Sequence, residues 1–400
     1  MTSTLVIVFS GNRSSKVNDG DSKDDDSEII PEPKETDFFE LSIIHINDFH
    51  ARFEETNERS FPCRPDDNCI GGLARTKTIV DRLRAKHKNS IFLNAGDNFQ
   101  GSFWYNLLRY NVTSYFLNKF RADATVIGNH EFAHRVGGLI PFINMLESPI
   151  VVANLNDHYE PQIQGLYKKS VIVERAGRKI GIIGVIFRET GDVANVGELR
   201  FTDEVTAIQE EATVIRRQGV NIIIVLSHCG LERDREIAMQ TGDYVDIIVG
   251  GHSHSFLYSN ADSAPGPDTP VGPYPIVMTP KTNTDRKVLI VQASAFTKYV
   301  GDLTVYFNAQ GHVKYYDGSP IYLSHDVLKD PEIERELIPW REAVDRLGNR
   351  LIGHSNVYLL NEGCRHGECL LGSFATDSFV QEVNYQSFKF ITKHNTLFSI

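Results

Sequence analysis

The chain has 400 residues, of which 41% are hydrophobic and 23% charged, and these ordinary globular values exclude a wholly disordered or fibrous protein. This length allows one large domain and part of another, of a soluble α/β class. The net charge of −11 argues against a surface that coats nucleic acid, because such a surface needs a dense basic patch. An anionic small substrate stays compatible with this charge if a bound metal ion supplies local positive charge.

The first 40 residues predict a flexible acidic segment, because they are rich in Ser, Asp, Glu and Lys and the run Asp24-Asp25-Asp26 repels itself. Their apolar stretch, Leu5–Phe9, is too short for the hydrophobic core of a signal peptide. The sequence has no apolar run of about 18 residues, so we expect no transmembrane segment.

Cysteine use favours an oxidising compartment. Four cysteines form two close pairs, Cys63 with Cys69 and Cys364 with Cys369. Such pairs are typical of disulfides in secreted proteins. In a cytosolic protein, the same cysteines could instead be zinc ligands or free thiols. Cys229 stands alone in an apolar run. The sequon Asn111–Thr113 is a weak indication of secretion, since this tripeptide often arises by chance.

The predicted strands and helices alternate along the chain, an order typical of sheets covered by helices. The first strand is the β-branched run Leu41–Ile46. Further strands are predicted at Ser90–Leu93, Ala124–Ile127, Pro149–Ala153, Lys179–Phe187, Val220–Leu226, Val245–Val249, Val288–Gln292 and Leu303–Phe307. Helices are predicted at Leu73–His87, Pro141–Glu147 and Asp203–Gln218, and the Pro/Gly-rich stretch from Asn260 to Pro275 predicts a loop.

The segment Asp330–Leu347 predicts a connecting helix. Pro331 stands at its start, and one helical face carries Ile333, Leu337, Trp340, Val344 and Leu347. The stretch that follows, 351–400, is too short for an ordinary second domain, and Leu397–Ile400 is expected to be a strand.

Polar clusters follow three of the early strands. Asp48 and His50 are two residues apart, so in extended backbone they point to one face, as two ligands of a metal ion do. Asp97 follows a glycine at a strand end, where a carboxylate can bridge two cations. Asn129 offers a neutral oxygen, and His130 can protonate or stabilise a departing oxygen. Each cluster alone also fits a surface turn or a helix cap.

Two histidine clusters follow later strands. His228 comes after the run Val220–Leu226, and a lone histidine in such a place is more often a satisfied polar group than a ligand. His252 and His254 lie two residues apart, directly after paired glycines. A purely structural role explains this pattern poorly. Taken together, the five clusters favour a metal site over separate structural roles. Each cluster follows a predicted strand, and ligands in open α/β sheets collect outside the carboxyl ends of strands. Imidazole and carboxylate groups favour zinc, and two such ions can activate water and hold a phosphoryl oxygen.

At these residues the sequence resembles the 5′-nucleotidase family of calcineurin-like metallophosphatases, especially animal ecto-5′-nucleotidases and insect salivary apyrases. The resemblance runs from Leu41 to about Val380 and rests on Ile46–Arg52, Gly71–Arg75, Gly96-Asp97, Gly128–Phe132, Gly250–His254 and the two cysteine loops. It implies a four-layer α/β/β/α metallophosphatase domain over 41–327 and a linker helix over 328–350. It also implies that 351–400 is only the beginning of a C-terminal α/β nucleotide-binding domain.

The resemblance also implies a ligand set. One metal ion would be held by Asp48, His50, Asp97 and His254, and the other by Asp97, Asn129, His228 and His252. Zinc is the expected metal, with Mn²⁺, Mg²⁺ or Co²⁺ as alternatives, and some family members replace His254. The pairs Cys63–Cys69 and Cys364–Cys369 would be disulfides.

Two departures from the family bear on activity. Ala133 stands where the family has an aspartate that pairs with the catalytic histidine, so His130 is expected to lose its orienting carboxylate. The family's C-terminal domain supplies the groups that hold the nucleoside, and only its beginning is expected here. Asn129 and His130 are therefore the substrate-binding residues that can be named.

We therefore expect a secreted or cell-surface hydrolase that removes phosphate from AMP, or from ADP and ATP in the manner of an apyrase. No nucleic-acid partner is expected, and a homodimer is one possible assembly of full-length family members. The alternative is a catalytically weakened or inactive homologue that acts as a secreted binding protein, which Ala133 and the short C-terminal part favour.

Overall fold

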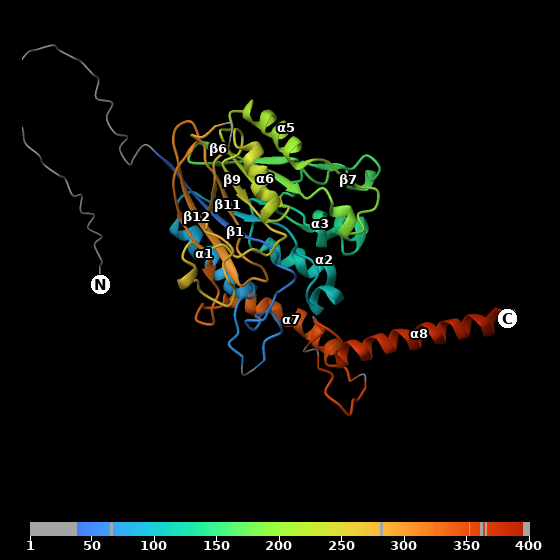
Figure 1. Cartoon of the computed structure of the whole chain (residues 1–400). Coiled ribbons are helices and arrows are strands. Elements are labelled where there is room, and N and C mark those ends of the chain that lie inside the picture. The colour runs from blue at the N-terminus through green and yellow to red at the C-terminus, as the bar shows by residue number, and fades with distance from the viewer. Residues whose placement is uncertain are drawn as a thin grey trace, which may run out of the picture.

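The computed structural model describes residues 38–64, 67–280, 283–351, 353–360, 363–364 and 366–394. Within them, two six-stranded sheets pack face to face around a common hydrophobic core, and helices cover their outer faces (Figure 1). This is the expected four-layer α/β/β/α arrangement.

The first sheet has the order β13-β12-β1-β2-β3, with β14 paired to β12. Its strands are β1 (Phe39–Ile46), β2 (Ser90–Asn94), β3 (Ala124–Thr125), β12 (Tyr299–Phe307), β13 (Val313–Gly318) and β14 (Ile321–Tyr322). β1 and β2 run parallel, with Ile46 opposite Asn94. Because parallel strands end at the same edge, the residues that follow these two strands lie close together.

The second sheet has the order β10-β11-β9-β8-β6-β5. Its strands are β5 (Ser170–Arg175), β6 (Arg178–Ile186), β8 (Ile222–His228), β9 (Ile247–Val249), β10 (Ile276–Met278) and β11 (Val288–Val291). The inner strands are parallel, and every residue of β8 and β9 is buried. Burial on both faces explains why their sequences are continuous apolar runs.

Helices occupy the two outer layers. α1 (Leu73–Lys86) packs on β2 and β12, whereas α5 (Glu204–Arg216) packs on β6, and α6 (Leu231–Thr241) packs on β10 and β11. α2 (Phe103–Asn118) and α3 (Arg135–Met145) pack on each other. The remaining short elements are α4 (Thr190–Val193), the 3₁₀ turns Asn129–Phe132, Pro161–Ile163 and Ala261–Ser263, and the two-stranded sheet of β4 (Leu155–Asn156) and β7 (Arg200–Phe201).

Most predicted elements are confirmed within a few residues, although two predictions were wrong or incomplete, and the strands β5, β10 and β13 were not predicted. The run Pro149–Ala153 forms only isolated bridges, because Ile150 and Val151 pair with different partners, Thr125 and Lys168. The helix predicted at Pro141 begins at Arg135 and contains that proline. The helices α2 and α6 were not predicted. In α2 the pattern is broken at Arg109, which has non-helical angles (φ 58°, ψ −146°).

The predicted connecting helix is α7 (Pro331–Gly348), which packs on α1 and α2. It buries Ile333, Leu337 and Val344, as its spacing predicts, but Leu347 is 45% exposed. Asp330 caps the helix by accepting a hydrogen bond from the Ile333 amide.

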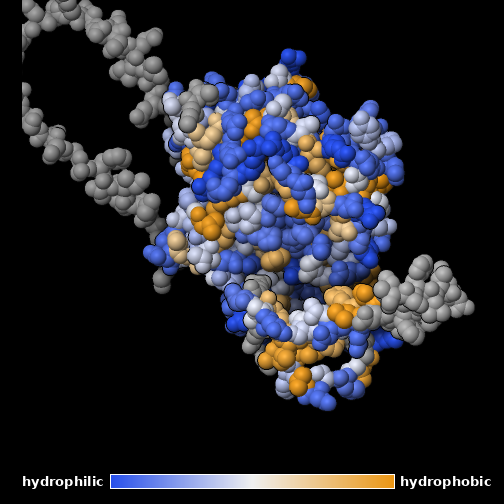
Figure 2. Space-filling view, turned by 45° about the vertical axis from the view of Figure 1, so that its right-hand side comes forward, coloured by the Kyte–Doolittle hydropathy of each residue, from blue (hydrophilic) through white to orange (hydrophobic). Residues whose placement is uncertain are grey.

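The segment after α7 differs from the body of the molecule. It ends in α8 (Leu370–His394), which projects away from the sheets (Figure 1). Figure 2 shows apolar surface on this segment, and its exposed side chains include Val357, Leu360, Leu370 and Phe374. The strand predicted at 397–400 and most of the predicted flexible segment 1–40 lie outside the described residues.

Both predicted disulfides, Cys63–Cys69 and Cys364–Cys369, are present, and Cys229 is a buried free thiol. Of the helices in the described ranges, none combines the length and the apolar character needed to cross a membrane.

Candidate metal centre

The polar clusters predicted from the sequence meet at the carboxyl ends of β1, β2, β3, β8 and β9. Three groups each place one ligand atom per residue within 4.8 Å of one another: Asp48, His50 and His254; Asp97, His228 and His252; and His50, Asp97 and His130. Asn129 belongs beside the second group, because its Oδ1 is 2.9 Å from His252 Nδ1. The structure thus brings together all seven predicted ligands and His130.

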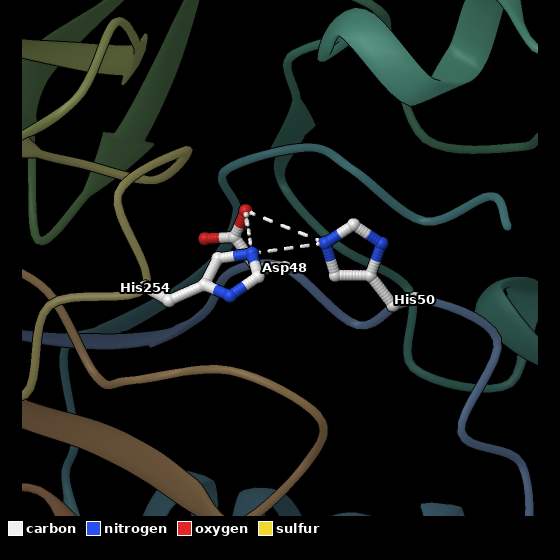
Figure 3. A group of neighbouring side chains, drawn as sticks. All are labelled: Asp48, His50 and His254. Carbon is white, nitrogen blue, oxygen red and sulfur yellow. Dashed lines mark hydrogen bonds and ion pairs between the residues drawn. The ribbon is translucent and has the colours of Figure 1, made fainter. Parts of the chain in front are cut away.

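The first group joins one loop from each sheet (Figure 3). His50 Nε2 and His254 Nε2 lie 3.0 Å apart, and His254 Nε2 is 3.4 Å from Asp48 Oδ1. Asp48 is fully buried and accepts hydrogen bonds from the His252 amide. Two imidazole nitrogens and a carboxylate oxygen therefore converge on one point.

The second group is more deeply buried. His228 Nε2 is 3.1 Å from Asp97 Oδ2. The same carboxylate oxygen is 3.8 Å from His50 Nε2 in the first group. Asp97 therefore lies between the two groups, where a carboxylate can bridge two cations.

Strained backbone conformations cluster at these residues. Five of the seven predicted ligands have φ between 48° and 74°, a region that side chains with a Cβ seldom adopt: Asp48, His50, Asp97, His252 and His254. Gly128 and Gly251 let the chains approach closely, because a Cβ on Gly128 would lie 2.2 Å from Asp97 Oδ1. A Cβ on Gly251 would lie 2.7 Å from the Ala95 carbonyl oxygen.

The donor set fits two divalent cations of the first transition row. Histidine nitrogens with carboxylate and amide oxygens are the ligands that zinc and similar ions bind. His228 Nε2 is buried, and its neighbour within the described residues is the Asp97 carboxylate, 3.1 Å away. Such a buried nitrogen fits a metal ligand better than a structural polar group.

Residues 41–256 match the sequence family described as calcineurin-like phosphoesterase. The chain belongs to the calcineurin-like phosphoesterase family. Members of this family use divalent metal ions, and the described residues contain candidate metal-binding groups.

Relatives of this phosphoesterase are named as nucleotide hydrolases. An apyrase from Tabanus yao is 48% identical over 345 residues, which cover 86% of the chain and 62% of that relative. A human 5′-nucleotidase is 37% identical over 348 residues, which cover 86% of the chain and 60% of that relative. The crystal structure of a 5′-nucleotidase precursor from Thermus thermophilus has a TM-score of 0.76 and 32% identity, covering 87% of this chain and 68% of that one. The chain spans about three fifths of the length of these curated relatives.

Burial and pairing set the protonation of the phosphoesterase's histidines. Burial lowers the pKa of His50 to about 4, against the opposing effect of Asp97 and Asp48, so its ring is neutral at physiological pH. Burial would also lower the pKa of His228, but the Asp97 carboxylate raises that pKa to about 10. Burial would raise the pKa of Asp97, but His228 holds it below its ordinary range.

His130 stands at the edge of the phosphoesterase's site. Its ring meets the His50 ring edge to face, with centroids 4.9 Å apart, and its backbone N–H donates to Asp97 Oδ1. Its Nδ1 lies 2.7 Å from Gln100 Oε1. Ala133, three residues further along the chain, has no side chain that could accept a hydrogen bond.

Sequence reasoning assigned no role to two buried residues that support the ligand loops. Glu131 accepts hydrogen bonds from the backbone N–H groups of Asp97, Asn98 and Gly128. Gln292 accepts from Ser253 Oγ and donates to the Gly251 carbonyl. The signal for Glu131 was its position in the Gly-Asn-His-Glu run, directly after two site residues. Gln292 carries no comparable signal.

Proposed function

We propose that the chain hydrolyses phosphate from nucleoside 5′-phosphates with two divalent metal ions, zinc in the first instance; the bond broken is the phosphomonoester in AMP and a phosphoanhydride in ADP and ATP. The observation that carries this proposal is the position of Asp97 between two ligand groups, 3.1 Å from His228 Nε2 and 3.8 Å from His50 Nε2. Asp48, His50, Asp97 and His254 would hold one ion, and Asp97, Asn129, His228 and His252 the other.

In such a reaction, different residues of the chain would bind the phosphate and transfer a proton. When bound, the metal ions supply a nucleophilic water and offset the charge on the phosphoryl oxygens. Asn129 is held by His252 and can donate its amide hydrogens to the substrate phosphate. His130, beside His50 and Asp97, can hold or transfer a proton at the leaving oxygen.

The choice of nucleotide follows from the relatives' names. Apyrase and 5′-nucleotidase both act on nucleoside phosphates, so AMP, ADP and ATP are the proposed substrates. We also propose an extracellular or cell-surface location, which the two disulfides support. The exposed Asn111 of the sequon would then be open to glycosylation.

A phosphate-release assay tests this proposal. Purified chain is loaded with zinc and given AMP, ADP and ATP in separate reactions, and bound zinc is counted. We expect release from at least one nucleotide with two ions per chain. Asp97→Asn should abolish release and bind fewer ions, whereas the matched exposed variant Asp262→Asn should behave as the parent protein. Two bound ions without release from any nucleotide would support the binding-protein alternative, and a failure to bind zinc would contradict the metal centre itself.

A further inference from the structure

Among the described residues, the side-chain hydrogen bond of the His130 ring is made with Gln100. The ring's Nδ1 lies 2.7 Å from Gln100 Oε1. An amide oxygen only accepts hydrogen bonds, so this contact requires the proton of a neutral His130 to lie on Nδ1. Nε2 is then the nitrogen left to act on a reacting oxygen.

The neighbours of His130 along the chain cannot take this role. Ala133 lies three residues on, at the end of the 3₁₀ turn Asn129–Phe132, and offers only a methyl group. His134 faces elsewhere, since its Nδ1 lies 3.0 Å from Arg109 Nη1 and its ring stacks on Tyr105. Gln100, from the loop after β2, is therefore the acceptor that the fold provides.

The loop that carries Gln100 is fixed on both sides. The His50 and Ala51 amides donate to the carbonyls of Asp97 and Asn98, at 2.9 and 3.1 Å. Beyond Gln100, Ser102 Oγ donates to the Ala51 carbonyl at 2.6 Å. Gln100 itself has φ 57°, a left-handed turn that this bonding holds in place. Its exposed side chain thus starts from a fixed backbone position.

We propose that Gln100 is a positioning residue for His130, in place of the carboxylate that Ala133 lacks. The expected effect of Gln100 on turnover rests on the proposed hydrolysis. Its effect on the tautomer of the His130 ring does not, because that is a property of the folded protein. A neutral amide can fix the tautomer and the plane of an imidazole. It stabilises a positive ring less than a carboxylate does, so the expected benefit is smaller than the roughly 10⁴-fold effect of a triad aspartate.

Kinetics of four variants test the role. Gln100→Ala should lower kcat about 10- to 100-fold, the usual range for a group that orients an active residue, with KM within about twofold and zinc content unchanged. Gln240→Ala, an exposed glutamine on α6, is the matched control. Ala133→Asp places a carboxylate one 3₁₀ turn after His130 at an exposed position, so it should restore kcat in the Gln100→Ala background. The rescue should exceed the effect of Ala133→Asp in the parent chain.

A second readout does not need turnover. Protein with ¹⁵N-labelled histidine, loaded with zinc, reports the tautomer of each ring, and His130→Asn assigns the His130 signal. We expect the Nδ1–H tautomer in the parent protein and a mixture in Gln100→Ala. The proposal is overturned if the tautomer is unchanged in Gln100→Ala, or if kcat is unchanged despite a changed tautomer. Additive effects in the double variant would also overturn it. If the parent protein releases no phosphate, the proposed function fails, and the tautomer alone decides whether Gln100 orients His130.

Discussion

The two sheets contribute chemically different halves of the candidate metal centre. The loops after β1, β2 and β3 supply its oxygen donors, Asp48, Asp97 and Asn129, together with His50. The segments at the ends of β8 and β9 supply only imidazoles, from His228, His252 and His254. Negative charge is thus concentrated on one side of the site.

The buried residues that hold the ligand loops also differ between the two halves. Glu131 receives three backbone N–H groups, at 3.0, 2.6 and 2.7 Å, and so joins the loops after β2 and β3. Gln292 is neutral, and its amide binds Gly251, Ser253 and Ser255 within a single loop. Because Glu131 joins two loops and Gln292 acts within one, the first half should respond more sharply to the loss of its support.

Gly128→Ala should give the largest effect, because the added Cβ would lie 2.2 Å from Asp97 Oδ1 and 2.6 Å from His228 Nε2. Displacing the shared carboxylate should reduce phosphate release by about 100-fold or more, with fewer than two ions bound. Gly137→Ala is the control, since its added Cβ meets nothing within 4 Å and should stabilise α3 by up to about 1 kcal/mol. Retention of both ions and full activity in Gly128→Ala would show that the first half is not rigid.

Glu131→Gln should weaken metal binding by about 10- to 100-fold, because an NH₂ group replaces one of the two carboxyl oxygens that accept from the backbone amides of the ligand loops. Zinc affinity is measured by competition with a chelator. The exposed Glu210→Gln makes the same chemical change on α5 and should leave that affinity unchanged.

Gln292→Ala should have a smaller effect on metal affinity than Glu131→Gln, because Gln292 supports only one ligand loop. It leaves the buried Ser255 amide without a partner, which should lower the free energy of unfolding by about 1–3 kcal/mol, whereas the Gly251 carbonyl still accepts from the Ser253 amide. Urea unfolding and zinc competition measure the two quantities. If Gln292→Ala lost more zinc affinity than Glu131→Gln, the half supported by Gln292 would be the more sensitive one, contrary to this prediction.

Asp203→Ala should have the smallest effect and lies in neither half. Asp203 caps α5 by accepting from the Thr206 amide at 2.8 Å, so its loss should cost about 1 kcal/mol with metal content unchanged. The Thr206 amide lowers the pKa of Asp203. The cap's ionic contribution is therefore present at neutral pH and is lost as the pH falls through that lowered value. Thermal unfolding at neutral and acid pH checks this, with Asp203→Asn as the variant that caps without titrating.

The convergence of the predicted ligands could be expected from the sequence, because each follows a strand that the hydrophobic pattern marks clearly. His228 and His252 are examples, since β8 and β9 are buried apolar runs with a polar residue at their ends. The roles of Glu131, Gln292 and Gln100 were not predictable, because each depends on backbone groups or rings brought near by folding. α2 was missed for a local reason, since the kink at Arg109 interrupts its helical period.

Of the five strands that precede predicted ligands, β1, β2, β8 and β9 lie inside their sheets with a paired neighbour on each side, whereas β3 ends the first sheet. Interior strands are the last to open in native-state hydrogen exchange. Release of an ion that needs both halves to separate should therefore be as slow as the exchange of amides in β1 and β8. Such a centre would keep its metals through the loop fluctuations that accompany substrate entry.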